Sequence, residues 1–192
     1  MAVESPTAPE TRRFTSDEVW RMADLGIISE DERLELIDGQ LLIVSPQGWS
    51  HERSIGHFTR IMSLAYGERY TVRVQTSVGG LRDHIPEPDV AVGLTDGPWD
   101  AERRHPRGDE LLVLVEVVVT NHWLARRKIA IYAEAGAPIY WIVDVPRRQV
   151  TVHEGPRPDG TWERVTVIPE SGNLVLPEFG TTLGVAKILP AA

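Results

Sequence analysis

The sequence predicts an α/β protein that forms a single domain. Residues 111–145 alternate between a strand pattern, a helix pattern and a second strand pattern, and antiparallel hairpin patterns lie before and after them. The chain has 192 residues, which suits one well-buried domain and is short for two. We expect the domain to span residues 14–192. Residues 1–13 lack an apolar segment and are expected to form a flexible tail.

The composition narrows the class of protein. No apolar run approaches the roughly 20 residues of a membrane span, and the first residues lack the apolar core of a signal peptide, so we expect a cytoplasmic protein with no membrane partner. The absence of cysteine excludes thiolate nucleophiles and zinc–thiolate sites. A formal net charge of −8 argues against a generally basic nucleic-acid-binding surface, but not against a local basic groove.

Two helices are expected in the first third of the chain. Thr15 or Ser16 can cap the first, which runs through Leu25. The second begins at Ser50, extends to about Tyr66 and carries His51 in its first turn. Its apolar residues recur at helical spacing: Ile55, Phe58, Ile61, Met62 and Ala65.

Strand patterns occupy much of the region between residues 33 and 92. Residues 33–37 and 40–44 alternate around Asp38-Gly39, which is a strong signal for a tight hairpin turn. Residues 70–76 and 78–82 also have strand patterns, and residues 90–92 begin another apolar strand. Residues 94–109 are polar and rich in glycine and proline, which predicts a surface loop.

The central segment predicts a βαβ unit. Residues 111–119 form an apolar, β-branched run that is interrupted by Glu116, as in a strand buried on both faces. A helix follows, and its inward stripe comprises Leu124, Lys128, Ile131, Tyr132 and Ala135. Residues 139–145 then resume an apolar strand. Glu116 and Lys128 are therefore expected to face one another between the strand and the helix.

The last part of the chain predicts an added C-terminal β-hairpin. Residues 149–153 and 161–168 alternate on either side of a turn at residues 155–160. The remaining apolar side chains are expected to pack against the edge of the domain.

Three charged residues suggest a catalytic site. Asp89 stands at the start of one strand, Glu116 lies within the next, and Lys128 lies on the helix that follows. Two carboxylates on neighbouring strands supply the hard oxygen ligands that Mg²⁺ or Mn²⁺ prefers, and a nearby ammonium can orient a water molecule. This is the chemistry of metal-assisted phosphodiester hydrolysis.

At these residues the sequence resembles a known family, the Uma-two family of putative restriction endonucleases within the PD-(D/E)XK nuclease superfamily. The matches follow the family's order over residues 14–168. They comprise Glu35-Leu36-Ile37-Asp38-Gly39-Gln40-Leu41, Ser45-Pro46, His51, Pro86-Glu87-Pro88-Asp89-Val90, Val115-Glu116-Val117, Lys128, Tyr132-Ala133-Glu134-Ala135-Gly136 and Tyr140-Trp141-Ile142-Val143-Asp144.

The resemblance implies a restriction-endonuclease-like core, with a central mixed β-sheet flanked by helices. It implies that Asp89, Glu116 and the backbone carbonyl of Val117 are metal ligands. It also implies that Lys128 is the motif lysine, moved from the strand to the helix, because Val118 stands where the simple motif would place it. Two further residues match common family positions. Glu35 would be an additional acid near the metal, and His51 a polar group near the phosphate.

The sequence also departs from the family pattern. Family members usually carry a serine-proline turn soon after the motif glutamate and an aspartate one helical turn before the lysine. Here those places hold Val119-Thr120-Asn121-His122 and Leu124. These changes bear on the register of the helix and on whether the site is catalytically competent.

Each candidate residue also has an ordinary structural explanation. Glu116 would pair with Arg126 or Arg127, Lys128 would extend its ammonium to solvent, Asp89 would be a turn residue, and Glu35 and His51 would face water.

The sequence therefore predicts a metal-dependent endonuclease that uses Mg²⁺ or Mn²⁺ and acts on DNA. Arg126 and Arg127 are candidate contacts for the nucleic acid, and a homodimer would suit two-fold symmetric cutting. One alternative is a catalytically degenerate relative that acts as a nucleic-acid-binding or protein-interaction module. The other alternative is a structural or dimerisation domain, which would not explain why Glu116 and Lys128 stand at inward positions.

Overall fold

The structure is a computed structural model that describes residues 11–29, 31–44, 48–120 and 122–190. Most of the tail predicted over residues 1–13 lies outside the described residues, as do the family-matching Ser45-Pro46 and the residue Asn121. Within the described ranges, no helix is both long and apolar enough to cross a membrane.

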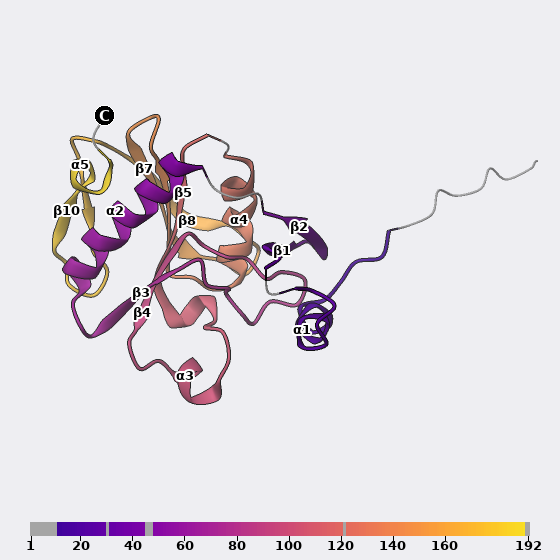
Figure 1. Cartoon of the computed structure of the whole chain (residues 1–192). Helices are drawn as coiled ribbons and strands as arrows, with labels where there is room; N and C mark the ends of the chain where they lie inside the picture. Colours follow the sequence, from indigo (N-terminus) through magenta and orange to yellow (C-terminus); the bar gives the residue numbers. More distant parts are fainter. Residues whose placement is uncertain (1–10, 30, 45–47, 121, 191–192) are drawn as a thin grey trace, which may run out of the picture.

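A six-stranded sheet forms the centre of the molecule (Figure 1). Its strands lie in the order β3-β4-β5-β6-β7-β8, and only β5 and β6 pair in parallel. The strands are β3 (Tyr70–Val74), β4 (Val90–Leu94), β5 (Leu111–Val118), β6 (Ile139–Asp144), β7 (Gln149–Pro156) and β8 (Trp162–Pro169). The mixed sheet, the βαβ unit and the C-terminal hairpin β7–β8 are confirmed. β7 continues further toward the turn than predicted, to Pro156, and β8 begins and ends one residue later than predicted.

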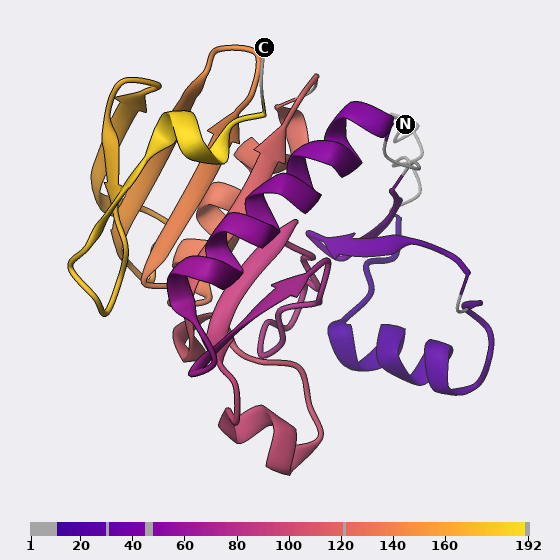
Figure 2. The ribbon, with the colours of Figure 1, turned by 60° about the vertical axis from the view of Figure 1, so that its left-hand side comes forward.

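Helices cover both faces of the sheet. α2 (Trp49–Tyr66) crosses one face, together with the C-terminal elements β9 (Asn173–Val175), β10 (Thr182–Gly184) and α5 (Val185–Ile188). α4 (Trp123–Glu134) covers the other face (Figure 2). The predicted α/β core with flanking helices is therefore confirmed.

Alternation along β5 decides which side chains reach which layer. Val113, Val115 and Val117 belong to the core cluster under α2, whereas Leu114 and Val118 belong to the cluster under α4. Because successive side chains of a strand point to opposite faces, Glu116 shares the face of Leu114 and Val118. The strand thus directs its one carboxylate toward α4.

The N-terminal region adds a helix and a hairpin beside the main sheet. α1 (Ser16–Asp24) begins with a capping box in which Thr15 and Glu18 satisfy each other's backbone N–H groups. β1 (Leu34–Ile37) and β2 (Gln40–Ile43) pair antiparallel around Asp38 and Gly39, whose φ angles of 52° and 70° fit the turn that their sequence predicts. The N–H of Ile85 donates to the carbonyl of Leu36 and ties the hairpin to the segment before β4.

Two predictions in the connecting regions are wrong. Residues 78–82 do not form a strand, because the N–H groups of Val78 and Gly79 donate to the loop carbonyls of Pro86 and Pro106. The predicted loop over residues 94–109 contains the short helix α3 (Pro98–Glu102) and the start of a 3₁₀ turn, η1 (Gly108–Glu110). Proline at the first turn and the buried side chain of Trp99 stabilise α3.

Candidate active site

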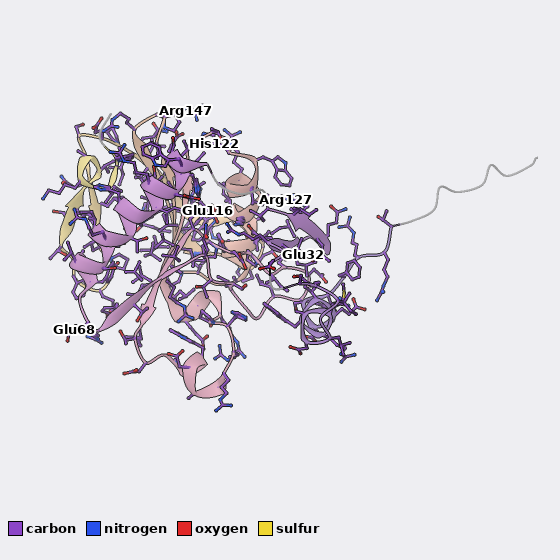
Figure 3. All side chains as sticks on the ribbon, viewed as in Figure 1. Glu32, Glu68, Glu116, His122, Arg127 and Arg147 are labelled. Carbon is purple, nitrogen blue, oxygen red and sulfur yellow. The ribbon has the colours of Figure 1, made fainter. Side chains whose placement is uncertain are left out.

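All of the predicted site residues line one cavity of about 130 Å³. The cavity lies where β1, α2, β5, α4 and the segment before β4 meet. Its charged and polar walls come from Glu35, His51, Glu87, Asp89, Glu116 and Lys128. Figure 3 shows Glu116 near the middle of the molecule, with Arg127 nearer to the N-terminal hairpin. Residues up to 93 positions apart in the sequence are therefore brought together at one place.

Lys128 is fully enclosed in this cavity, and its side chain is 1% exposed. Its ammonium Nζ lies 2.8 Å from Oε2 of Glu35 and 2.8 Å from Oε1 of Glu116, and it donates to the carbonyl oxygen of Glu87 at 2.7 Å. An ammonium has three N–H donors, and three acceptors meet it here. The alternative in which Lys128 extends to solvent is therefore wrong.

Glu116 is buried and accepts two hydrogen bonds on the same oxygen. Oε1 accepts from Lys128 at 2.8 Å and from the hydroxyl of Tyr132 at 3.2 Å. Burial raises the pKa of Glu116 to about 8; the charges of Asp89 and Glu35 also raise it, and Lys128 opposes them. The cation beside Glu116 is thus Lys128, and the alternative pairing with Arg127 is wrong because Arg127 pairs with Asp38.

Glu35 is 3% exposed, so the explanation in which it faces water is wrong. Its carboxylate contacts Lys128 and accepts from the backbone N–H of Glu87 at 3.1 Å. Burial alone would lower the pKa of Lys128. The negative charges of Glu116 and Glu35 outweigh burial and raise this pKa above its ordinary value.

Glu87 is a site residue to which the sequence analysis gave no role. Its backbone contacts both Glu35 and Lys128, and its side chain accepts from the hydroxyl of Ser77 at 3.1 Å. Burial and the charge of Glu35 raise the pKa of Glu87. The sequence did carry a signal for this residue, because Glu87 stands between two prolines and close to Asp89. The prolines restrict the backbone that makes these contacts. Four acids thus line the cavity around one ammonium.

Asp89 binds the strand next to its own. Oδ2 accepts from the backbone N–H of Val117 at 2.8 Å, at a point where β5 extends past the start of β4. The next carbonyl along β5, that of Val118, accepts from Val145 on the opposite side. Since backbone groups alternate between the two edges of a strand, the carbonyl of Val117 faces the side of Asp89. Asp89 is therefore more than a turn residue.

His51 lies in the first turn of α2 and reaches the same carboxylate. Its Nε2 lies 3.2 Å from Oδ2 of Asp89, and its side chain is only 18% exposed, so the surface explanation is wrong. Burial lowers the pKa of His51, but the hydrogen bond and the charge of Asp89 outweigh burial and raise it. Within the part of the chain that the structure describes, the other ring nitrogen, Nδ1, is buried without a hydrogen-bond partner.

The departures from the family pattern have clear places in the structure. Leu124 lines the cavity and contributes no carboxylate where the family usually has one. His122 does not replace it: its Nε2 lies 3.5 Å from Oδ2 of Asp144 and 3.3 Å from Nη1 of Arg147. Figure 3 shows His122 and Arg147 near each other, away from Glu116.

The described ranges contain no group of three or more histidine, aspartate or glutamate side chains placed to hold a metal ion. The predicted ligand set has two carboxylates and one backbone carbonyl, so it would not form such a group. Asp89, Glu116 and Val117 as metal ligands therefore stay a prediction.

Comparison with known proteins identifies the family. Residues 17–186 match the Uma2 family, described as a putative restriction endonuclease. The chain belongs to the Uma2 family. The fold of this Uma2 chain is similar to the crystal structure of a putative nuclease belonging to DUF820 from Anabaena variabilis, with a TM-score of 0.66 at 16% sequence identity. The alignment covers 91% of this chain and 97% of that one. No curated protein matches the chain.

Proposed function

We propose that this Uma2 protein is a metal-dependent endonuclease that hydrolyses phosphodiester bonds in DNA. One observation carries the proposal: Asp89, Glu116 and Lys128 come from three separate elements and line the same small cavity. Burying three acids, Glu35, Asp89 and Glu116, near one ammonium is costly, and a divalent cation at the site would offset that cost.

The oxygen atoms around the cavity suit a hard divalent cation. The carboxylates of Asp89 and Glu116 and the carbonyl of Val117 would hold Mg²⁺ or Mn²⁺. Both hydrogen bonds to Glu116 use Oε1, so Oε2 is the oxygen that would serve the ion. When bound, such an ion stabilises negative charge on the phosphate and lowers the pKa of a water ligand.

The protein's own groups would orient the reaction. Lys128 fixes Glu116 and Glu35 with charge-assisted hydrogen bonds, and it must release one of its three acceptors before it can contact an attacking water. His51 is held by Asp89 through Nε2, and its buried Nδ1 would have to become accessible before it could donate to a phosphate oxygen.

One observation favours a second candidate function. Leu124 lines the cavity at the place of a usual family carboxylate, and an apolar side chain there supplies nothing to a metal or a water. A protein that kept the fold and bound nucleic acid without cutting it would tolerate this change.

Nicking of supercoiled plasmid distinguishes the two candidates. A nuclease nicks plasmid with Mg²⁺ or Mn²⁺, not with EDTA, and loses the activity on Glu116→Gln. The chain offers a matched control for Lys128→Ala, because its other lysine, Lys187, is exposed on α5. Lys187→Ala should nick like the parent, whereas Lys128→Ala should not. If the parent protein binds DNA but does not nick it, the second candidate is favoured.

A further inference from the structure

An exposed tryptophan begins each of the two helices that line the cavity. Trp49 is the first residue of α2 and is 70% exposed, and Trp123 is the first residue of α4 and is 57% exposed. His51 and Leu124, at most two residues away from them, line the cavity itself. Single exposed apolar side chains are common, but tryptophan is enriched at binding surfaces.

We propose that these tryptophans stack against unpaired bases next to the phosphodiester that the protein cuts, so that its substrate is single-stranded or locally unpaired nucleic acid. This inference rests on the proposed function and names the substrate class of the same site. Stacking on an aromatic side chain needs an open base face, and inside a duplex each base face is covered by its neighbours.

The placement of the two helices suits this role. Figures 1 and 2 show that α2 and α4 both begin at the end of the sheet where β5 ends. Both helix starts border the cavity, since His51 from α2 and Leu124 from α4 both line it. A nucleic-acid strand with its phosphate in the cavity would therefore pass near the starts of both helices, and each helix begins with a tryptophan.

An arginine lies over the ring of Trp49, and a second arginine contacts the residue that precedes Trp123. The guanidinium of Arg53 lies 5.3 Å from the ring centroid of Trp49, one helical turn along α2, and supports one face of the ring. Arg147 contacts His122, the residue before Trp123, and its side chain is 59% exposed while the buried carboxylate of Asp144 anchors it at 2.9 Å. Positive charge beside an aromatic platform is the combination that single-strand-binding proteins use.

The overall charge favours the same class of substrate. Affinity for a duplex rests largely on neutralising many phosphates, and a chain with a formal net charge of −8 is poorly equipped for that. Stacking contributes affinity without a broad basic surface and tolerates any base sequence.

Binding measured without cleavage tests the inference. The full chain in EDTA is titrated into fluorescein-labelled oligothymidine of about 15 nucleotides and into the matching duplex. Trp49→Ala and Trp123→Ala should each weaken oligothymidine binding by about fivefold or more and leave the weaker duplex binding unchanged. Trp49→Phe and Trp123→Phe should retain most of the affinity. Leu64→Ala is the matched control, because Leu64 is 71% exposed near the other end of α2.

Three results would overturn the inference. These are unchanged oligothymidine affinity in both alanine variants, equal weakening for duplex and single strand, and alanine variants that differ from the parent only in self-association. Cleavage of the same labelled oligothymidine in Mg²⁺, beside plasmid nicking, keeps this test separate from the proposed function. Cleavage without a tryptophan effect refutes the stacking alone, whereas tryptophan-dependent binding without cleavage of either nucleic acid refutes the nuclease alone.

Discussion

The ammonium of Lys128 lies 2.8 Å from Oε1 of Glu116, across the interface between α4 and β5. In the simple nuclease motif the lysine stands on the strand, two residues after the glutamate. Here the positive charge comes from helix α4 instead. At that strand position stands Val118, which is part of the core under α4. With the lysine on the helix, the buried ion pair is kept, and the strand position is left for an apolar side chain that packs in the core.

The shape of the ammonium, and not only its charge, should matter to the reaction. Lys128→Arg keeps a positive charge, but a planar guanidinium cannot meet three acceptors arranged around one nitrogen in an enclosed space. We expect plasmid nicking to fall at least about a hundredfold, in the range of a lost catalytic group. Lys187→Arg should nick at the rate of the parent. Equal rates for both variants would remove Lys128 from the mechanism.

Metal binding should stabilise the fold whether or not the protein is active. An ion that binds only the folded state adds about 2.7 kcal/mol to the free energy of unfolding at a hundredfold excess over Kd. In EDTA, Glu116→Gln should keep or raise the melting temperature because it relieves repulsion among the buried acids. In Mn²⁺, the same variant should lose most of the rise in melting temperature that the ion causes in the parent. Glu110→Gln is the control, since Glu110 pairs with Arg104 elsewhere and its loss should leave the metal response intact. A parent insensitive to both Mn²⁺ and Mg²⁺ would contradict the metal site.

The metal-free protein should become less stable as pH rises from about 4.5 to about 8. Burial raises the pKa of Glu116 to about 8 from its ordinary 4.5, so within that window the folded state holds a proton that the unfolded chain has released. This contribution of Glu116 to stability is fully present below pH 4.5 and is lost as the pH rises through about 8. The free energy of unfolding should fall by at most about 1.4 kcal/mol per pH unit. Urea unfolding in EDTA across this range measures the slope. Glu116→Gln should flatten it, and an identical slope in that variant would contradict the assignment.

Two substitutions at Asp89 should separate its structural role from its charge. Asp89→Asn keeps an oxygen that accepts from the N–H of Val117, so its stability in EDTA should stay near that of the parent. Asp89→Ala leaves this N–H without its acceptor and should cost about 1–3 kcal/mol. Both should lose the Mn²⁺-induced rise in melting temperature. A rise that persists in Asp89→Asn would show that the ion does not use this carboxylate.

The meeting of Glu116 and Lys128 could be predicted from the sequence, because both positions follow from local periodicity. Alternation along a β-branched strand puts Glu116 on one face, and the apolar stripe of the helix puts Lys128 on the side that covers it. The short connection between them leaves few other arrangements.

The other contacts of the site could not be predicted in this way. Glu35 reaches Lys128 across 93 residues, and the carbonyl of Glu87 reaches it across 41, so both contacts depend on how separate elements dock. Neither leaves a periodic trace in the sequence. The helix α3 was missed for a related reason: its glycine- and proline-rich surroundings predict a loop, and the burial of Trp99 overrides that local preference.

The distance along the chain between Glu35 and Lys128 also fixes when the cavity can exist. A ribosome releases the N-terminal hairpin first, and it must add the 93 residues that separate the pair before the ammonium emerges. A nascent chain or a fragment that stops before α4 carries Glu35 and Glu116 without their shared cation. Such a product cannot assemble the site, and a protein made beside messenger RNA therefore stays incomplete until α4 has been translated.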